Sequence, residues 1–233
     1  MKGRFTSIMS TPMTGTTTIT NLARLLQLAS PTLPVGAYSY SQGLEAAVEA
    51  RIVNDAASAQ RWIGDVLEFS MAKMEAPLFL RMCRAWQEGL DLGPLNVLFL
   101  ASRETAELRA ETLQMGYSLG ELLPRLGLKE IDLPEISFPA AFSFAVAAWK
   151  IDSAAALAAY LWAWLENQVM AAVKAVPLGK SDGQRILLAL GERLFRVAQE
   201  ASSMKDDQLG NFAPGLAVLS SRHETQYSRL FRS

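Results

Sequence analysis

The sequence predicts an all-α protein: a single-domain multi-helix bundle of roughly nine to twelve helices with no sheet. Three observations support this fold class. No segment of useful length alternates apolar and polar residues, as a half-buried strand would. Ala, Leu, Glu, Gln and Arg, which favour helices, dominate the chain. Apolar residues recur at helical spacing between proline and glycine breaks, and 233 residues that are 50% hydrophobic suffice for one substantial core.

The charge balance excludes some classes of partner. The chain has 22 basic and 23 acidic side chains, so we expect neither nucleic-acid binding nor attraction to a membrane surface. The longest uncharged apolar run outside the opening stretch, Ile136 to Trp149, is too short to span a bilayer. The single cysteine, Cys83, excludes an intrachain disulfide framework and fits a reducing compartment. We therefore expect a cytoplasmic protein.

We divide the chain into a flexible N-terminal arm (residues 1–20), a helical domain (21–221) and a C-terminal tail (222–233). The arm lacks an apolar run long enough for a signal peptide. A first helix through Leu25–Ala29 should end near Ser30-Pro31, because a residue before proline disfavours helical backbone. No residue between Arg24 and Glu45 is charged. This opening stretch is therefore either a buried junction between helices or a groove or interface at the surface.

The helices of the first half are placed by the signals at their ends. We expect a short helix from Gly43 to Ala50, a longer one capped by Asn54-Asp55, a kink or restart at Pro77 with a stop at Gly89, and a helix from Gly93-Pro94 through Glu111. The charged half of this last helix, Ser102 to Glu111, should face solvent, where Arg103 and Glu107 can pair four residues apart.

The second half begins with a loop from Ile131 to Phe138. We then expect a helix from Pro139 to near Lys150, one from Ala154 to about Val176, one from Gly183 to about Ser203 capped by Ser181-Asp182, and a short one opening at Pro214. The helix from Ala154 to Val176 is apolar nearly all round, so it should be the central buried helix.

Few residues here could support metal chemistry. Tight sites for late first-row metals use imidazole and thiolate. The chain has one histidine, His223, and one cysteine, with no paired spacing between them. We therefore predict no cofactor and no metal site within one protomer. A two-fold dimer could at most bring two His223 side chains together in a weak shared site.

Nucleotide and nucleophile motifs are incomplete. Gly179-Lys180-Ser181 resembles the end of a phosphate-binding P-loop, but position 174 is lysine where that motif needs glycine. A Ser–His–acid arrangement would have to join His223 and Glu224 to Ser39 or Ser41, and the chain has no G-x-S-x-G elbow. We predict that the protein is not an enzyme. A hydrolase that uses His223 is the less favoured alternative.

Binding is the remaining class of function, and the tail is the best evidence for it. If the tail is helical, Tyr227, Leu230 and Phe231 form a narrow apolar stripe, one turn after His223. Twelve residues cannot hold a helix alone, so the tail docks on this chain, folds against a partner or frays. The connection from Lys174 to Arg185 is either a second binding element or an ordinary link between helices. A general helical adaptor with other partners stays open as an alternative.

Three stretches together resemble one known family. ASPTLPVGAYSYSQGLEAAVEA, at residues 29–50, closely resembles the N-terminal signature of the urease accessory protein UreF. VMAAVKAVPLGKSDGQRIL, at residues 169–187, is similar to its central VPLG-type element. SSRHETQYSRLFRS, at residues 220–233, resembles its C-terminal tail. The three stretches stand in the family's order and span nearly the whole chain.

The resemblance implies a urease maturation factor: a dimeric, non-enzymatic helical scaffold. Such a scaffold would bind UreD/UreH, recruit the GTPase UreG and gate GTP-coupled nickel insertion into apo-urease. Hydrolysis of GTP by UreG would agree with the incomplete P-loop of this chain.

The resemblance also implies partner-binding residues in the three stretches. In the tail, facing UreD/UreH and the dimer, these are Arg222, His223, Glu224, Tyr227, Arg229, Leu230, Phe231 and Arg232. In the central element, implicated in UreG contact, they are Lys174, Pro177, Gly179 and Lys180. In the opening signature they are Pro34, Gly36, Tyr38, Ser39, Gly43 and Glu45. The sequence departs from the family pattern at two places. Gly36-Ala37 stands where family members often have two glycines, and Lys180 stands where they often have a glutamine.

Overall fold

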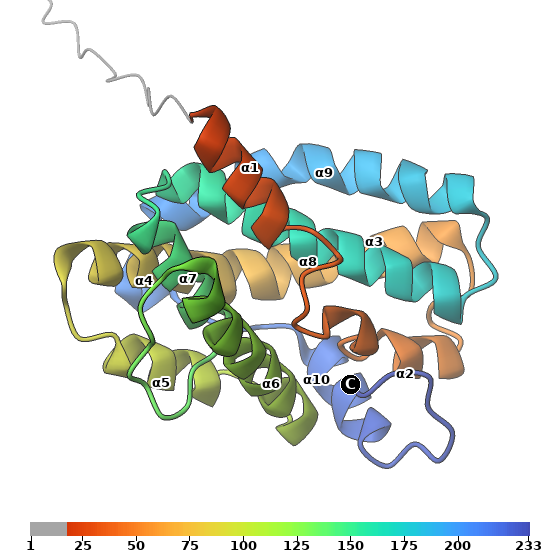
Figure 1. Cartoon of the computed structure of the whole chain (residues 1–233). Coiled ribbons are helices and arrows are strands. Elements are labelled where there is room, and N and C mark those ends of the chain that lie inside the picture. The colour runs from red at the N-terminus through yellow and green to blue at the C-terminus, as the bar shows by residue number, and fades with distance from the viewer. Residues whose placement is uncertain (1–17) are drawn as a thin grey trace, which may run out of the picture.

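The structure is a computed structural model that describes residues 18–233, apart from the side chain of Lys180. Over these residues the chain forms one bundle of ten α-helices without a strand, which confirms the predicted fold class (Figure 1). Among residues 18–233 no helix is both long and apolar enough to cross a membrane.

The helices follow one another with short connections. In chain order they are α1 (Ile19–Leu28), α2 (Leu44–Glu49), α3 (Ala56–Val66), α4 (Ala76–Glu88), α5 (Gly93–Ala101), α6 (Ala106–Leu122), α7 (Phe138–Ala148), α8 (Ser153–Ala175), α9 (Lys180–Ser203) and α10 (Pro214–His223). Helix α1 begins inside the stretch predicted as an arm, since Thr18 caps it by accepting from the backbone N–H of Asn21. Residues 1–17 of that arm lie outside the described residues.

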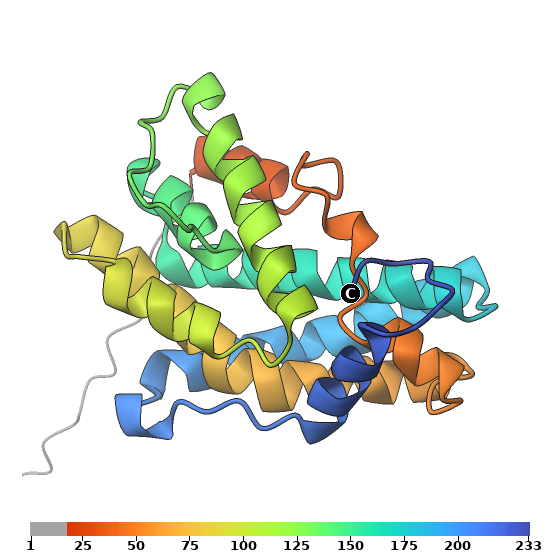
Figure 2. The same ribbon diagram turned by 90° about the horizontal axis from the view of Figure 1, so that it is seen from below.

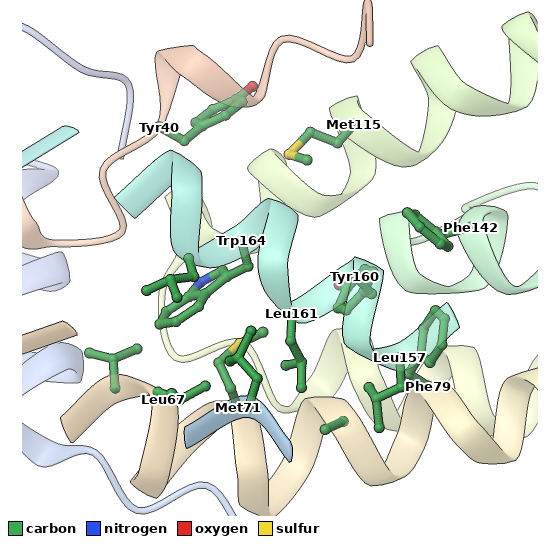
Figure 3. Close-up of a cluster of buried hydrophobic side chains, with 14 of the residues drawn as sticks. Tyr40, Leu67, Met71, Phe79, Met115, Phe142, Leu157, Tyr160, Leu161 and Trp164 are labelled. Carbon is green, nitrogen blue, oxygen red and sulfur yellow. The ribbon is translucent and has the colours of Figure 1, made fainter. Parts of the chain in front are cut away.

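Helix α8 lies at the centre of the bundle, as its apolar sequence predicts. It packs along α9 and also contacts α4, α2 and α1. Figure 3 shows its side chains Leu157, Leu161 and Trp164 directed at the helix below, and Tyr160 beside Phe79. The Tyr160 ring stacks on Phe79 with centroids 4.7 Å apart. The side of α8 away from the core is less covered, since Trp162 and Met170 are partly exposed.

The long helix expected to kink at Pro77 contains a π-helix, η2 (Leu67–Glu75), between α3 and α4. Proline cannot donate to the carbonyl four residues earlier, and its ring crowds that carbonyl. In this structure the Lys73 carbonyl accepts instead from the N–H of Gly210, at 3.2 Å, and the Phe69 carbonyl accepts from Phe212, at 3.3 Å. The segment before α10 thus donates hydrogen bonds to two carbonyl groups of the π-helix η2.

The single helix predicted from Gly93 through Glu111 is wrong, because the chain breaks between α5 and α6. Thr105 caps α6 by accepting from the N–H of Leu108. Arg103, in the break, turns inward to pair with buried Glu75, with 3.1 Å between Nη1 and Oε2. The expected pair of Arg103 with Glu107 is therefore replaced by a contact with a distant part of the sequence.

Helix α9 begins three residues earlier than expected. Its N-cap is Gly179, whose N–H donates to the carboxylate of Asp182, at 3.1 Å. The cap predicted at Ser181-Asp182 lies inside the helix, because the acidic side chain reaches back to the start of the first turn rather than capping from outside.

Gly116 allows α6 to approach the loop before α7. A Cβ atom added at Gly116 would lie 2.1 Å from the Ile136 carbonyl oxygen, whereas one at Gly120, a turn later, would lie 4.0 Å from Ile136 Cγ2. We predict that Gly116→Ala destabilises the protein by about 3 kcal/mol or more, because backbone must shift. Gly120→Ala should be neutral or stabilise by about 0.5–1 kcal/mol through helix propensity. Urea unfolding of both variants tests this, and similar values for the two would contradict it.

Candidate functional site

The tail folds back onto the body of the protein instead of continuing as a helix. Helix α10 ends at His223, and residues 224–233 return beside the opening stretch and α2 (Figures 1 and 2). The predicted helical stripe is therefore wrong: Phe231 is buried, whereas Tyr227 is fully exposed and Leu230 is 62% exposed. Of the expected alternatives for the tail, docking on its own chain is the one observed.

The carboxylate of Glu45 holds the tail by its backbone. Glu45 lies in the first turn of α2, and its oxygens accept from the N–H groups of Leu230, at 2.6 Å, and Phe231, at 2.8 Å. The same carboxylate contacts His223 Nε2 at 3.2 Å. These two N–H groups have no helical or strand partner, so a fixed acceptor replaces the hydrogen bonds that regular structure would supply.

His223 joins the two carboxylates that anchor the tail. Its side chain is fully buried, and its Nδ1 lies 2.7 Å from the carboxylate of Glu107 on α6. Both ring nitrogens thus face carboxylates, which only the doubly protonated ring can donate to at the same time. Arg229 of the tail also donates to Glu107. His223 is therefore engaged within the fold, and neither ring nitrogen is available to a nucleophilic serine or to a second copy of the residue.

The last residue of the tail is buried with a third carboxylate. The N–H and the hydroxyl of Ser41 both donate to the Ser233 carbonyl oxygen. The hydroxyl of Ser233 donates to Glu111 on α6 at 2.8 Å, and the amide of Gln42 donates to the other oxygen of Glu111 at 2.7 Å. One residue earlier, the N–H of Arg232 donates to the Ser39 carbonyl at 2.8 Å. The opening stretch and the tail are thereby paired along their backbones.

Burial changes the acid–base behaviour of Glu111. Removal from water raises the pKa of its carboxyl to about 7, although the hydrogen bonds from Gln42 and Ser233 lower it. The nearby charge of Glu75 raises this pKa further, and Arg103 lowers it. The neutral form of this carboxyl therefore suits the buried position under the tail better than the charged form does.

The central element meets the other two stretches through Lys174. Its ammonium group, near the end of α8, lies 5.9 Å from the ring centroid of Tyr38 and 5.8 Å from that of Phe231. Distances of this size permit a cation–π attraction to both rings. Pro177 and Gly179 lie exposed in the connection to α9 and make no part of this contact. Lys174 and Tyr38 are exposed, so this junction of the three stretches reaches the surface.

Two glycines shape the opening stretch. Gly36 and Gly43 have φ angles of +79° and +77°, which favour glycine. A Cβ atom at Gly43 would also lie 3.2 Å from Leu216 Cδ1 on α10. Ala37 begins the 3-10 helix η1 (Ala37–Ser39) with an ordinary negative φ, so a second glycine is not needed for this turn. Pro34, just before it, is exposed.

A cavity of about 110 Å³ lies beneath the opening stretch, between α6 and α8. Its lining includes Glu111 and the buried triad of Glu75, Arg103 and Tyr160, in which the Tyr160 hydroxyl and Arg103 both donate to Glu75. The Nε of Arg103 is buried without a protein partner. The space and the polar groups suit ordered water, which would extend the polar contacts from the tail into the core.

Sequence reasoning missed the residues of α6 that anchor the tail. Glu107 and Glu111 were expected on a solvated face, yet one binds His223 and the other is buried. Glu107 and Glu111 are like charges four residues apart, and such a pair destabilises an exposed helix unless something compensates it. This spacing is therefore a weak signal that the two residues have partners elsewhere in the fold. Among residues 18–233, no group of three or more His, Cys, Asp or Glu side chains is arranged to hold a metal ion.

The anchoring role of Glu45 predicts the behaviour of two backbone amides. In Glu45→Ala the N–H groups of Leu230 and Phe231 lose their acceptor, so their hydrogen exchange should become at least about tenfold faster, in line with the loss of hydrogen bonds to a charged group. Glu49→Ala, on the exposed side of the same helix, is the matched control. Unchanged exchange in Glu45→Ala would contradict this account of the tail.

The raised pKa of Glu111 predicts a dependence of stability on pH. Because this pKa is higher in the folded state than in the unfolded chain, its contribution to stability is complete at pH 4 and is lost as the pH rises through about 7. Glu111→Gln imitates the protonated form. We expect the free energy of unfolding, measured with urea, to fall between pH 5 and pH 8 by about 2–3 kcal/mol more in the unchanged protein than in this variant.

Exposed Glu121→Gln, on the same helix, controls for the change of net charge and should keep the pH dependence of the unchanged protein. Equal pH dependence in Glu111→Gln and the unchanged protein would show that the buried carboxyl does not titrate in this range.

Comparison with known proteins agrees with the resemblance of the three stretches. The UreF family model matches residues 53–191. A protein of Azoarcus sp. (strain BH72) described as urease accessory protein UreF is 58% identical over 225 residues, which cover 91% of this chain and 95% of that protein. Proteins with the same description from Dechloromonas aromatica (strain RCB) and Methylobacillus flagellatus are 52% and 50% identical, over 93% and 91% of this chain and 99% and 98% of their own. The chain therefore belongs to the UreF family of urease accessory proteins.

Proposed function

We propose that this protein is a non-enzymatic scaffold for urease maturation in the cytoplasm. As a homodimer it binds UreD/UreH, recruits the GTPase UreG and gates the GTP-coupled transfer of nickel, the cargo, into apo-urease. Its own part in this process is to present surfaces to other proteins. The description of the relatives as urease accessory proteins supports the process, and the partners are part of the proposal.

The observation that carries the proposal is the junction of three separate stretches at one surface. Tyr38 of the opening stretch, Lys174 of the central element and Phe231 of the tail lie together there. Large exposed side chains, Tyr227 and Leu230, stand on the tail beside this junction. Tyrosine, phenylalanine and arginine are enriched at protein interfaces, which supports this face as the one that binds UreD/UreH.

The environment of His223 favours a scaffold over a hydrolase. A general base needs a ring nitrogen within reach of the nucleophile. Here both nitrogens contact the carboxylates of Glu45 and Glu107, and the hydroxyl of Ser41 donates to the tail instead. The histidine is better suited to hold the tail in place than to abstract a proton.

The exposed tail residues provide the sharpest test of partner binding. Because Tyr227 and Leu230 are exposed, their joint replacement by Ala should leave the fold intact. We predict that this variant binds purified UreD/UreH at least about thirtyfold more weakly, the effect expected for loss of interface anchors of about 2 kcal/mol. The measurement is retention on immobilised UreD/UreH, followed by capture of UreG and activation of apo-urease with nickel.

Phe195→Ala is the control, since Phe195 is an exposed aromatic residue of similar size on α9, outside the three stretches. Full retention of the tail variant would remove the tail from the interface. Failure of the unchanged protein to retain either UreD/UreH or UreG would contradict the scaffold itself and favour an adaptor with other partners.

A further inference from the structure

The cavity beneath the opening stretch has walls that are fixed to one another. The opening stretch covers it, α8 lies beneath it, and α6 closes one side. Two hydrogen bonds tie the opening stretch to α8 here. The indole N–H of Trp164 donates to the side-chain oxygen of Gln42 at 2.8 Å, and the amide of Asn167 donates to the Tyr40 carbonyl at 3.1 Å. The cavity is therefore formed before anything binds in it, as is usual for small-molecule sites in proteins.

Most of the interior of this cavity is apolar. Side chains from the opening stretch, α5, α6 and α7 line it: Leu33, Val35, Phe99, Leu108, Met115 and Phe138. Water suits the polar end, at Arg103 and Glu75, but these apolar side chains offer it no hydrogen bond. An apolar cavity of about 150 Å³ binds benzene, so about 110 Å³ has room for a chain of roughly four carbon atoms.

Among the charged groups that line the cavity, one carboxyl has no partner. Arg103 and Glu75 are paired, with 3.1 Å between Nη1 and Oε2, and each oxygen of Glu111 accepts a hydrogen bond. Glu166 on α8 has no hydrogen-bond or ion-pair partner among residues 18–233, and burial alone raises the pKa of its carboxyl. A partly buried carboxylate without a partner is costly, and a bound cation would compensate it.

The cavity opens to the surface on the side where Glu166 lies. Tyr38 and Met170 also line it, and these two side chains are 67% and 46% exposed. Met170 follows Glu166 by one helical turn, so the two share this side of α8. The exposed ring of Tyr38 offers a cation a second attraction. Lys174, the cation nearest to that ring, lies two turns beyond Glu166 along α8, which is about 12 Å. The mouth thus favours a positive charge, whereas the interior favours an apolar chain.

We propose that this cavity binds a small primary alkylammonium ion, whose short chain enters the apolar interior while its ammonium group stays at the mouth with Glu166 and Tyr38. A carboxylate of the same length would be repelled by Glu166, and an alcohol would keep the apolar contacts without the ion pair. A lysine side chain from another protein does not fit, because its chain leads into backbone, which would have to enter the apolar interior. This site goes beyond the proposed function, since none of its contacts involves another protein.

A chemical-shift titration of the isotope-labelled full-length protein at low salt tests the site with three probes of equal length: n-butylammonium, n-butanol and butyrate. We expect n-butylammonium to bind at least about tenfold more tightly than butyrate, with n-butanol between them, because only the ammonium pairs with Glu166. Shortening the probe to n-propylammonium should weaken binding about fourfold, the effect of one buried methylene group. Equal binding of n-butylammonium and butyrate would overturn the proposal, and so would equal binding of n-butylammonium and a lysine with both backbone ends capped.

Two variants separate the role of the carboxyl from that of the space. Glu166→Gln should weaken n-butylammonium binding at least about tenfold and leave n-butanol binding unchanged. Glu192→Gln, exposed on α9 and outside the cavity, is the control and should change neither. Ala163→Leu places a larger side chain in the cavity and should abolish binding of both probes.

Unchanged binding of n-butylammonium in Glu166→Gln would overturn the proposal, whether or not Ala163→Leu folds. These titrations contain no urease protein, so their failure leaves the proposal of a maturation scaffold untouched.

Discussion

The hydrogen bonds from the tail backbone to Glu45 are the constraint on which the site depends. A segment without regular structure can be buried only if its N–H and carbonyl groups find partners. Here the carboxylate of Glu45 receives the N–H groups of Leu230 and Phe231, and Ser41 donates to the terminal carbonyl. These contacts fix the path of the tail, and that path buries the ring of Phe231 and leaves Leu230 outside.

The same arrangement gathers three carboxylates, which must be compensated. Glu45 and Glu107 share the ring of His223, and Glu107 also receives Arg229. Burial raises the pKa of Glu111, and the hydrogen bonds that this carboxyl accepts from Gln42 and Ser233 offset only part of that effect. Because these hydrogen bonds come from the opening stretch and the tail, Glu111 joins both segments to α6.

The helices and their ends are well predicted from the sequence where neighbouring residues decide them. The cap at Asp55, the stop at Gly89 and the apolar helix α8 follow from residues close in the chain. Of the candidate site, the three stretches could be found from their resemblance to one family, and Glu45, Tyr38 and Lys174 do lie at their junction. Glu107 and Glu111 could not be found, because their partners are more than sixty residues away in the sequence.

The sequence by itself therefore determined an all-helical fold, most of the helix ends and the glycines that turn the opening stretch, because propensity, capping and positive φ act within a few residues. Only the tertiary structure decided that the chain breaks at Arg103, which pairs with Glu75, that His223 lies between two carboxylates and that the tail folds back without a helix. Each of these outcomes depends on which distant groups share a buried space, where an unpaired charge or N–H group is too costly to leave.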